Sequence, residues 1–159
     1  MTCTFFGHRD CPEMRPYLRT VLADLISNHQ VDTFLVGNNG QFDGQVRAVL
    51  RQLSQEYPQI RYAVVLSRVP GQKAAGEDYK DTMLPEGLEE IHPKFAIDWR
   101  NRWMLGQADY VVTYIRHNWG GAWKYASLAR KQNKYIYNIE LLKKPLPVSG
   151  GAKMMGSGP

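Results

Sequence analysis

The sequence predicts an α/β fold in which helices cover both faces of a mainly parallel, five-stranded sheet. Apolar segments of strand length alternate along the chain with segments whose apolar residues recur at helical spacing. Residues 60–66 (IRYAVVL) are apolar almost throughout, as expected for a strand that helices cover on both faces. Loops that contain glycine and polar residues follow three of the expected strands. Ligands bind beyond the carboxyl ends of strands in folds of this class, so these loops are the first candidates for a site.

The first unit begins with a strand at residues 2–6, which the loop Gly7-His8-Arg9-Asp10 ends. Pro12 suits a first helical turn. From residue 14 onward, the apolar side chains then form one helical face, at Met14, Leu18, Val21, Leu22, Leu25 and Ile26.

Residues 31–43 (VDTFLVGNNGQFD) form the stretch around which the other units are organised. A buried strand at residues 33–36 leads into a loop with two glycines and two asparagines. Asp43 is then expected to start and cap the helix that follows. Such a junction attracts anions because the N–H groups of the first helical turn are unpaired and the helix dipole is positive there.

The rest of the chain continues the alternation after one irregular segment. Residues 67–93 are rich in proline and glycine and are expected to form a long loop or flap over the site, with a short helix near residues 86–91. A helix is expected at residues 94–108, a strand at 109–115, a helix opened by Gly120 and Gly121, and a strand at 134–139. Residues 1–140 are therefore expected to form one domain, and residues 141–159 a flexible C-terminal tail.

The composition is ordinary for a globular protein, with 43% hydrophobic and 22% charged residues in a chain of 159. The net charge of +5 permits an anionic partner, but the basic residues are spread along the chain rather than gathered in one block. No apolar run reaches membrane-spanning length, and no signal peptide is recognisable. The two cysteines do not form a CxxC motif, so a reducing, cytoplasmic location is expected. Because no apolar run could span a membrane, no membrane partner is expected.

Sheet topology predicts that the polar loops meet. In the usual strand order 3-2-1-4-5, the winding reverses between the first and fourth strands. This order brings Gly7, His8 and Arg9 beside the loop at residues 116–121, which contains His117, Trp119, Gly120 and Gly121, while the loop at residues 37–43 flanks them. We expect a pocket there for a phosphate-bearing small molecule.

The residue types in these loops suit such a ligand. Glycines, including Gly37 and Gly40, allow the backbone to approach a ligand closely. The guanidinium of Arg9 can grip a phosphate. The side-chain amides of Asn38, Asn39 and Gln41 are expected to hydrogen-bond a sugar or base. Trp119 or Trp123 is a candidate to stack on a base.

Structural roles compete with each of these assignments. Glycines after strands are common turn residues, and Asp43 suits a helix cap better than a catalytic group. Trp99, Trp103 and Trp123 fall at positions that suit the core. His8 and His117, with Asp10 and Cys11, make a metal site conceivable, but no HxxxH or CxxC spacing supports one, and no metal or cofactor is expected. The absence of GxSxG, Walker and GxGxxG motifs disfavours serine hydrolases, P-loop NTPases and standard dinucleotide dehydrogenases.

Four segments together resemble the SLOG superfamily: FFGHR, VGNNGQFD, FAIDWRNRWM and TYIRHNWGGAW. This group of Rossmann-like domains is related to the DNA-processing protein DprA and to LOG-type phosphoribohydrolases. The similarity covers most of residues 2–139 and is greatest to small bacterial YpsA-like single-domain members. It implies a Rossmann-like three-layer sandwich and a nucleotide-derived ligand in the pocket already inferred.

The resemblance also identifies a further residue and a departure from the family pattern. Arg100, in the DWRN segment, looks like the arginine of the RK motif in LOG-type enzymes. Those enzymes carry a PGGxGTxxE motif, whereas this chain reads WGGAWKYAS and has Ser127 where the glutamate would be. A carboxylate at that position would assist N-glycosidic cleavage, so its replacement puts LOG-type hydrolysis in doubt.

Three functions follow, in descending order. The first is binding or sensing of a nucleotide or an ADP-ribose-like molecule. The second is an N-glycosidic phosphoribohydrolase, in which Arg9 and Arg100 hold the phosphate and Asp43 is a weak catalytic candidate. The third is DprA-like binding of single-stranded nucleic acid, ranked last because the aromatic residues mostly fall at core-like spacings. Family analogy alone implies a homo-oligomer.

Overall fold

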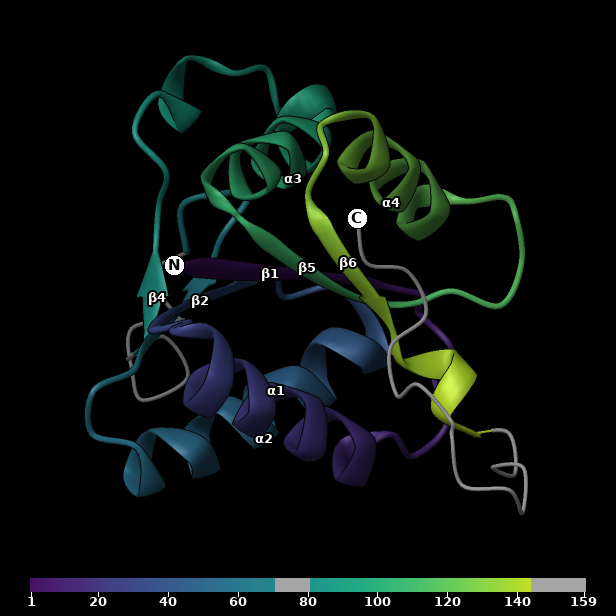
Figure 1. Ribbon diagram of the computed structural model, residues 1–159. Coiled ribbons are helices and arrows are strands. Elements are labelled where there is room, and N and C mark those ends of the chain that lie inside the picture. Colours follow the sequence, from purple (N-terminus) through teal and green to yellow (C-terminus); the bar gives the residue numbers. More distant parts are fainter. Residues whose placement is uncertain (71–80, 144–159) are drawn as a thin grey trace.

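The protein forms three layers, with a parallel sheet between two pairs of helices (Figure 1). The computed structural model describes residues 1–70 and 81–143. Six strands lie in the order β4-β3-β2-β1-β5-β6, and every neighbouring pair is parallel. Helices α1 and α2 cover one face of the sheet, and α3 and α4 cover the other (Figure 1).

The strands are β1 (Thr2–Gly7), β2 (Thr33–Val36), β3 (Arg61–Val65), β4 (Thr82–Met83), β5 (Tyr110–Tyr114) and β6 (Tyr135–Asn138). The α-helices are α1 (Arg15–His29), α2 (Gly40–Glu56), α3 (Ala96–Gln107) and α4 (Gly121–Lys131). The short 3₁₀ helices in the described part of the chain are η3 (Leu88–Glu90), η4 (Pro93–Phe95) and η5 (Ile139–Lys143).

The prediction of a five-stranded sheet is wrong, because the sheet has a sixth strand. β4 lies within the segment 67–93 that was expected to be a loop, and it pairs with β3 through Val64↔Thr82 and Val65↔Met83. A strand of two residues is too short to show an alternating pattern in the sequence. The five predicted strands do lie in the predicted order, and β4 extends the sheet beyond β3.

Several boundaries also differ from the prediction. α2 begins at Gly40, three residues before Asp43, and Pro16 rather than Pro12 occupies the first turn of α1. η3 lies where a short helix was expected, whereas residues 71–80 of the predicted flap lie outside the described residues. The predicted tail at 141–159 begins inside η5, where Leu142 packs against the core, and residues 144–159 also lie outside the described part.

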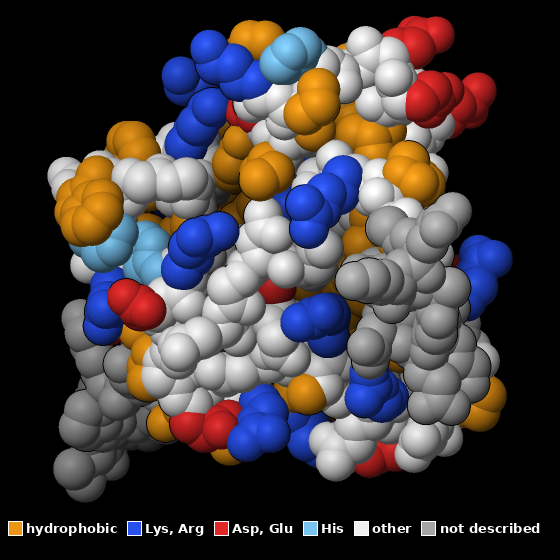
Figure 2. Space-filling view, turned by 180° about the vertical axis from the view of Figure 1, so that it is seen from behind, with side chains coloured by type: hydrophobic (Ala, Val, Ile, Leu, Met, Phe, Trp, Pro, Cys, Tyr) orange, Lys and Arg blue, Asp and Glu red, His pale blue; other side chains and the backbone are white. Residues whose placement is uncertain are grey.

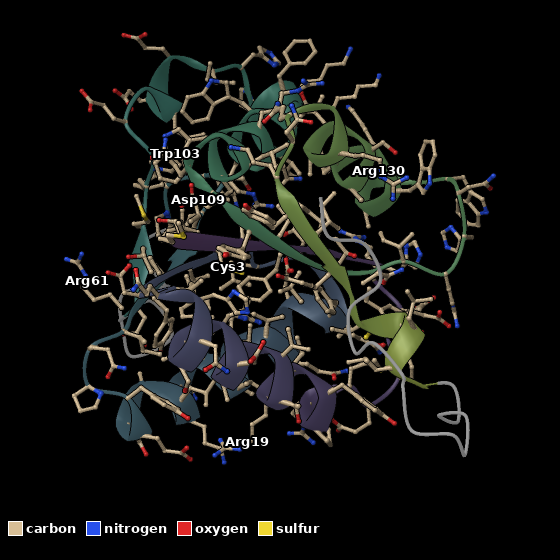
Figure 3. All side chains as sticks on the ribbon, in the orientation of Figure 1. Cys3, Arg19, Arg61, Trp103, Asp109 and Arg130 are labelled. Carbon is tan, nitrogen blue, oxygen red and sulfur yellow. The ribbon has the colours of Figure 1, made fainter. Side chains whose placement is uncertain are left out.

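Two apolar cores lie on the two faces of the sheet. Alternation along β1 sends Cys3 and Phe5 toward α1 and α2, and Phe6 toward α3 and α4. Figure 3 shows Cys3 at the centre of the molecule and Arg19 extending from α1 away from the sheet. No helix in residues 1–70 and 81–143 has the length and apolar character needed to cross a membrane.

Gly7 closes β1 against the first turn of α2, and this contact leaves no room for a side chain. A Cβ atom at Gly7 would lie 2.3 Å from two ring atoms of Phe42, which is fully buried. We expect Gly7→Ala to lower the free energy of unfolding by about 2–3 kcal/mol because the buried ring must move. Urea unfolding measures this change.

Gly106→Ala is the matched control. Gly106 lies in α3, and a Cβ there would meet no atom within 4 Å. The same substitution should therefore raise the unfolding free energy by up to about 1 kcal/mol through helix propensity. Equal effects at the two glycines would contradict the packing of Gly7 on Phe42.

Candidate functional site

A cavity of about 190 Å³ lies beyond the carboxyl ends of the central strands β1, β2 and β5. These strand ends point to the right in Figure 1. The predicted site residues that line the cavity are Gly7, Arg9, Asn39, Asp43, Arg100 and Gly121. Residues from all three predicted loops, and from α3, therefore line one cavity.

Two helix N-termini face this cavity, and they differ in charge. The backbone N–H of Asn39, the residue before α2, donates to Asp43 Oδ2 at 3.0 Å, so a carboxylate already occupies this helix end. α4 begins at Gly121 with no acidic residue in its first turn, and no described side chain caps it. The positive end of the α4 dipole therefore stays free to attract an anion.

Arg9 lies on the cavity wall and is fixed through its backbone. Its carbonyl accepts a hydrogen bond from the N–H of Gln41 at 2.9 Å. A Cβ at Gly40, whose φ is +88°, would lie only 2.9 Å from Arg9 Cα, so the first two loops pack directly on each other. The Arg9 side chain is exposed, and its guanidinium has no hydrogen bond or ion pair to any residue that the structure describes.

Arg100 supplies a second positive charge to the cavity, and its side chain packs against the loop at residues 37–39. Its side chain is 1% exposed, and Nη1 donates to the Val65 carbonyl at 2.8 Å and to Asn38 Oδ1 at 3.1 Å. A Cβ at Gly37 would lie 2.9 Å from Asp43 Oδ2 and 3.3 Å from Arg100 Cζ. Glycine at this position therefore makes room for both charged groups.

Burial determines the ionisation of Asp43. It raises the pKa of Asp43 from 3.8 to about 6, although the Asn39 N–H, Arg100 and Arg47 act in the opposite direction. Burial also lowers the pKa of Arg100, against the attraction of Asp43. Asp43 is thus a helix-capping carboxylate that takes up a proton at mildly acidic pH while lining the cavity.

His8, His117 and Trp119 form a stacked series beside the cavity rather than lining it. The ring centroids of His8 and His117 are 3.7 Å apart, and those of His117 and Trp119 are 3.8 Å apart. His8 Nε2 accepts a hydrogen bond from the Arg116 N–H at 3.0 Å, which requires a neutral ring. Burial, His117 and Arg116 all lower the pKa of His8 in accord with this. The stack fixes the loop that leads into α4.

Other predicted residues shape the loops. Gln41 was expected to contact a sugar or base, but its Oε1 accepts from the Cys11 N–H at 2.9 Å. Gly120 has a φ of +92° and turns the chain into α4. Trp123 was expected in the core, yet it is 41% exposed. Among the described residues, no group of three or more His, Cys, Asp or Glu side chains could hold a metal ion.

Seven of the thirteen residues that line the cavity were not predicted from the sequence. These residues are Phe5, Phe6, Ile97, Asn101, Met104, Ala122 and Tyr125. Ile97, Asn101 and Met104 recur with Arg100 at spacings of three to four residues, so one face of α3 was detectable once Arg100 was assigned to the site. Asp98 secures this helix to α4 by accepting from Tyr125 Oη at 2.6 Å and Lys124 Nζ at 2.9 Å. The Tyr125 hydrogen bond is the main cause that lowers the pKa of Asp98 to about 2.

Comparisons with known proteins bear on the fold. No protein-family model and no curated protein matches this sequence. Among solved structures, the chain is similar to DNA processing protein A (DprA) from Streptococcus pneumoniae, with a TM-score of 0.62. The chain has the Rossmann-like fold of DprA. At 17% identity the similarity shows the fold alone, and it covers 94% of this chain but only 52% of the DprA chain.

The similarity confirms the coarse part of the predicted relationship, a Rossmann-like fold related to that of DprA. The finer resemblance to YpsA-like single-domain proteins stays a prediction. Because the chain spans about half the length of that DprA chain, the activity of DprA does not transfer with the fold.

The raised pKa of Asp43 predicts an unusual pH dependence of stability. Between pH 3.8 and about 6 the folded protein binds more protons at Asp43 than the unfolded chain does, so the contribution of Asp43 to stability falls as pH rises. We expect the unfolding free energy of Asp43→Asn, relative to the parent, to rise by about 1–3 kcal/mol from pH 4 to pH 7. Urea unfolding at both pH values tests this.

Asp109→Asn is a suitable control, because Asp109 is exposed and also accepts a hydrogen bond from a backbone N–H, that of Thr2 at 3.0 Å. This variant should show no comparable rise. If the difference in unfolding free energy between Asp43→Asn and the parent stayed constant from pH 4 to pH 7, the raised pKa of Asp43 would be contradicted.

Proposed function

We propose that this protein binds a nucleotide or a nucleotide-derived molecule through its phosphate, in the cavity beyond β1, β2 and β5. The observation that carries the proposal is that the uncapped N-terminus of α4 and the basic residue Arg9 line one cavity. Backbone N–H groups and a planar guanidinium are the two donor types that proteins combine to hold phosphate.

The surroundings of the cavity favour an anion there. Arg100 adds positive charge in the cavity wall. The carboxylate of Asp43 is directed to the start of α2 because it accepts a hydrogen bond from the Asn39 N–H. The phosphate is therefore assigned to α4 rather than to α2. The cavity also has an apolar part, formed by Phe5, Phe6 and Met104, which limits competing hydration of the bound group.

Calorimetry and thermal shift with AMP, ADP and ADP-ribose test the proposal. Ligand at about one hundred times its dissociation constant should add about 2.7 kcal/mol to stability. Arg9→Ala should weaken binding about tenfold or more, because a charge-assisted bidentate contact is lost. Arg130→Ala, at the other end of α4, is the control and should bind like the parent.

Two results would contradict the proposal: no stabilisation by any phosphate compound, or equal affinity in Arg9→Ala and the parent. A single-stranded oligonucleotide belongs in the panel because the structural neighbour is named a DNA processing protein. Basic side chains are dispersed over the face shown in Figure 2 rather than joined in one patch, which favours the small ligand.

A second candidate function is cleavage of the N-glycosidic bond of a bound nucleotide. Asp43 favours it, because this carboxylate lines the same cavity as Arg9 and has a pKa of about 6. A carboxyl group with such a pKa can act as an acid or as a base near neutral pH. Asp43 is also the one carboxylate that lines the cavity among the described residues.

Chromatography of a nucleoside monophosphate panel incubated with the protein tests this activity. We expect release of free base by the parent and loss of about 100-fold or more of the rate in Asp43→Asn, as for removal of a general acid or base. The variant should retain its affinity for the nucleotide. Equal rates in the two proteins would exclude Asp43 as the catalytic group.

A further inference from the structure

A larger pocket of about 650 Å³ opens beside the cavity at the start of α3. The two share Asn39 and Ile97 in their walls, so they adjoin each other at the end of the sheet. The wall of the larger pocket combines apolar and polar residues, and its apolar residues are Val69, Leu84, Leu88, Ile91, Pro93, Ala96 and Ile97. Polar groups come from Asn38 and Asn39 and from the Ser67–Arg68 turn and Glu89.

Several of these apolar side chains are exposed to an unusual degree. Val69 is 67% exposed, Ile97 47% and Leu84 41%. Figure 2 shows hydrophobic side chains gathered on the upper half of the molecule, the half that contains α3 and α4. Clustered exposed apolar groups around a concave surface are typical of a ligand site.

Size indicates how a nucleotide would divide between the two spaces. Sites for drug-sized ligands enclose about 300–1,000 Å³, so a cavity of 190 Å³ holds a phosphate and little more. The remainder of a nucleotide must leave the cavity, and the shared residues Asn39 and Ile97 mark where the neighbouring space begins. That space is large enough for a nucleobase, and its apolar and polar residues match the faces and the edges of one.

We propose that the pocket between Leu84 and Ile97 binds the base of a nucleoside phosphate whose phosphate lies at the N-terminus of α4. This inference rests on the proposed function and deepens it, because it makes the base a determinant of affinity. It also assigns a role to the segment that carries β4 and η3, which forms one wall of the pocket.

Asn38 provides a polar group in the larger pocket. Its Oδ1 accepts a hydrogen bond from Arg100 Nη1 at 3.1 Å, so the amide orientation is fixed and its Nδ2 group is left to donate. Asn38 lines the larger pocket. A base acceptor or a ribose hydroxyl oxygen is the matching group on the ligand.

This placement differs from stacking on tryptophan, which the sequence suggested. Neither Trp119 nor Trp123 lines either space. One face of Trp119 is already covered by His117, although the side chain is 66% exposed. Affinity that depends on Trp119 would therefore contradict the assignment of the base to the larger pocket.

The test compares ribose 5-phosphate with AMP, GMP, CMP and UMP by calorimetry. We expect the tightest nucleotide to bind the parent at least about tenfold more tightly than ribose 5-phosphate, because the base removes apolar surface from water. The double variant Val69→Gln/Leu84→Gln should weaken that nucleotide at least about fivefold and leave ribose 5-phosphate unchanged within about twofold. Glutamine introduces no charge, so it does not alter the attraction for phosphate.

Two controls accompany this variant. Leu141→Gln changes a leucine with the same 41% exposure in η5, far from the pocket in sequence, and it should bind like the parent. Trp119→Ala should also leave the preference for the nucleotide unchanged.

The outcomes separate the inference from the proposed function. Equal affinity of the parent for ribose 5-phosphate and every nucleotide would overturn the base pocket but keep the phosphate site. A preference that survives Val69→Gln/Leu84→Gln, or that is lost in Trp119→Ala, would also overturn it. If no phosphate compound binds the parent, the proposed function fails and the base pocket fails with it.

Discussion

The buried guanidinium of Arg100 is the group on which the arrangement of the site depends. From α3 it binds the Val65 carbonyl at the end of β3 and Asn38 in the loop after β2, and Gly37 gives it the space to do so. A buried cation is costly without such partners, so the loop and the strand end must keep their positions around it. Arg100 thereby joins three elements that lie far apart in the sequence, and it does so in the wall of the cavity.

Asp43 is the acidic residue in the same cavity wall as Arg100, and it makes the N-termini of α2 and α4 differ in charge. The Asp43 carboxylate accepts a hydrogen bond from the Asn39 N–H and so occupies the N-terminus of α2. Burial raises the pKa of this carboxylate to about 6. α4 has no comparable acidic group in its first turn. Of two helix ends that point at one cavity, only the second thus offers its dipole to an incoming anion. The asymmetry follows from one carboxylate and not from the fold.

Loop-to-loop packing accounts for several residues that first suggest a ligand. Gly7 faces Phe42, Gly40 faces Arg9, and Gln41 binds the Cys11 N–H. Such contacts hold the loops in position without a ligand, and loops that are already in position lose less entropy on binding. The same residue types occur in ligand-binding loops. A glycine allows close approach of either a neighbouring loop or a ligand, and a side-chain amide can hydrogen-bond either a neighbouring backbone or a sugar.

The sequence by itself determined the alternation of strands and helices, the order of the five long strands and the meeting of three loops at their carboxyl ends. These features follow from apolar periodicity and from the handedness of parallel crossovers, both of which are local or general rules. It did not reveal β4, because a two-residue strand has no period. Only the tertiary structure decided that Arg9, Asp43 and Arg100 line the cavity while His8, His117 and Trp119 stack beside it. The physical reason is that periodicity encodes which side chains are buried, whereas the identity of their partners depends on contacts between loops that are distant in the chain.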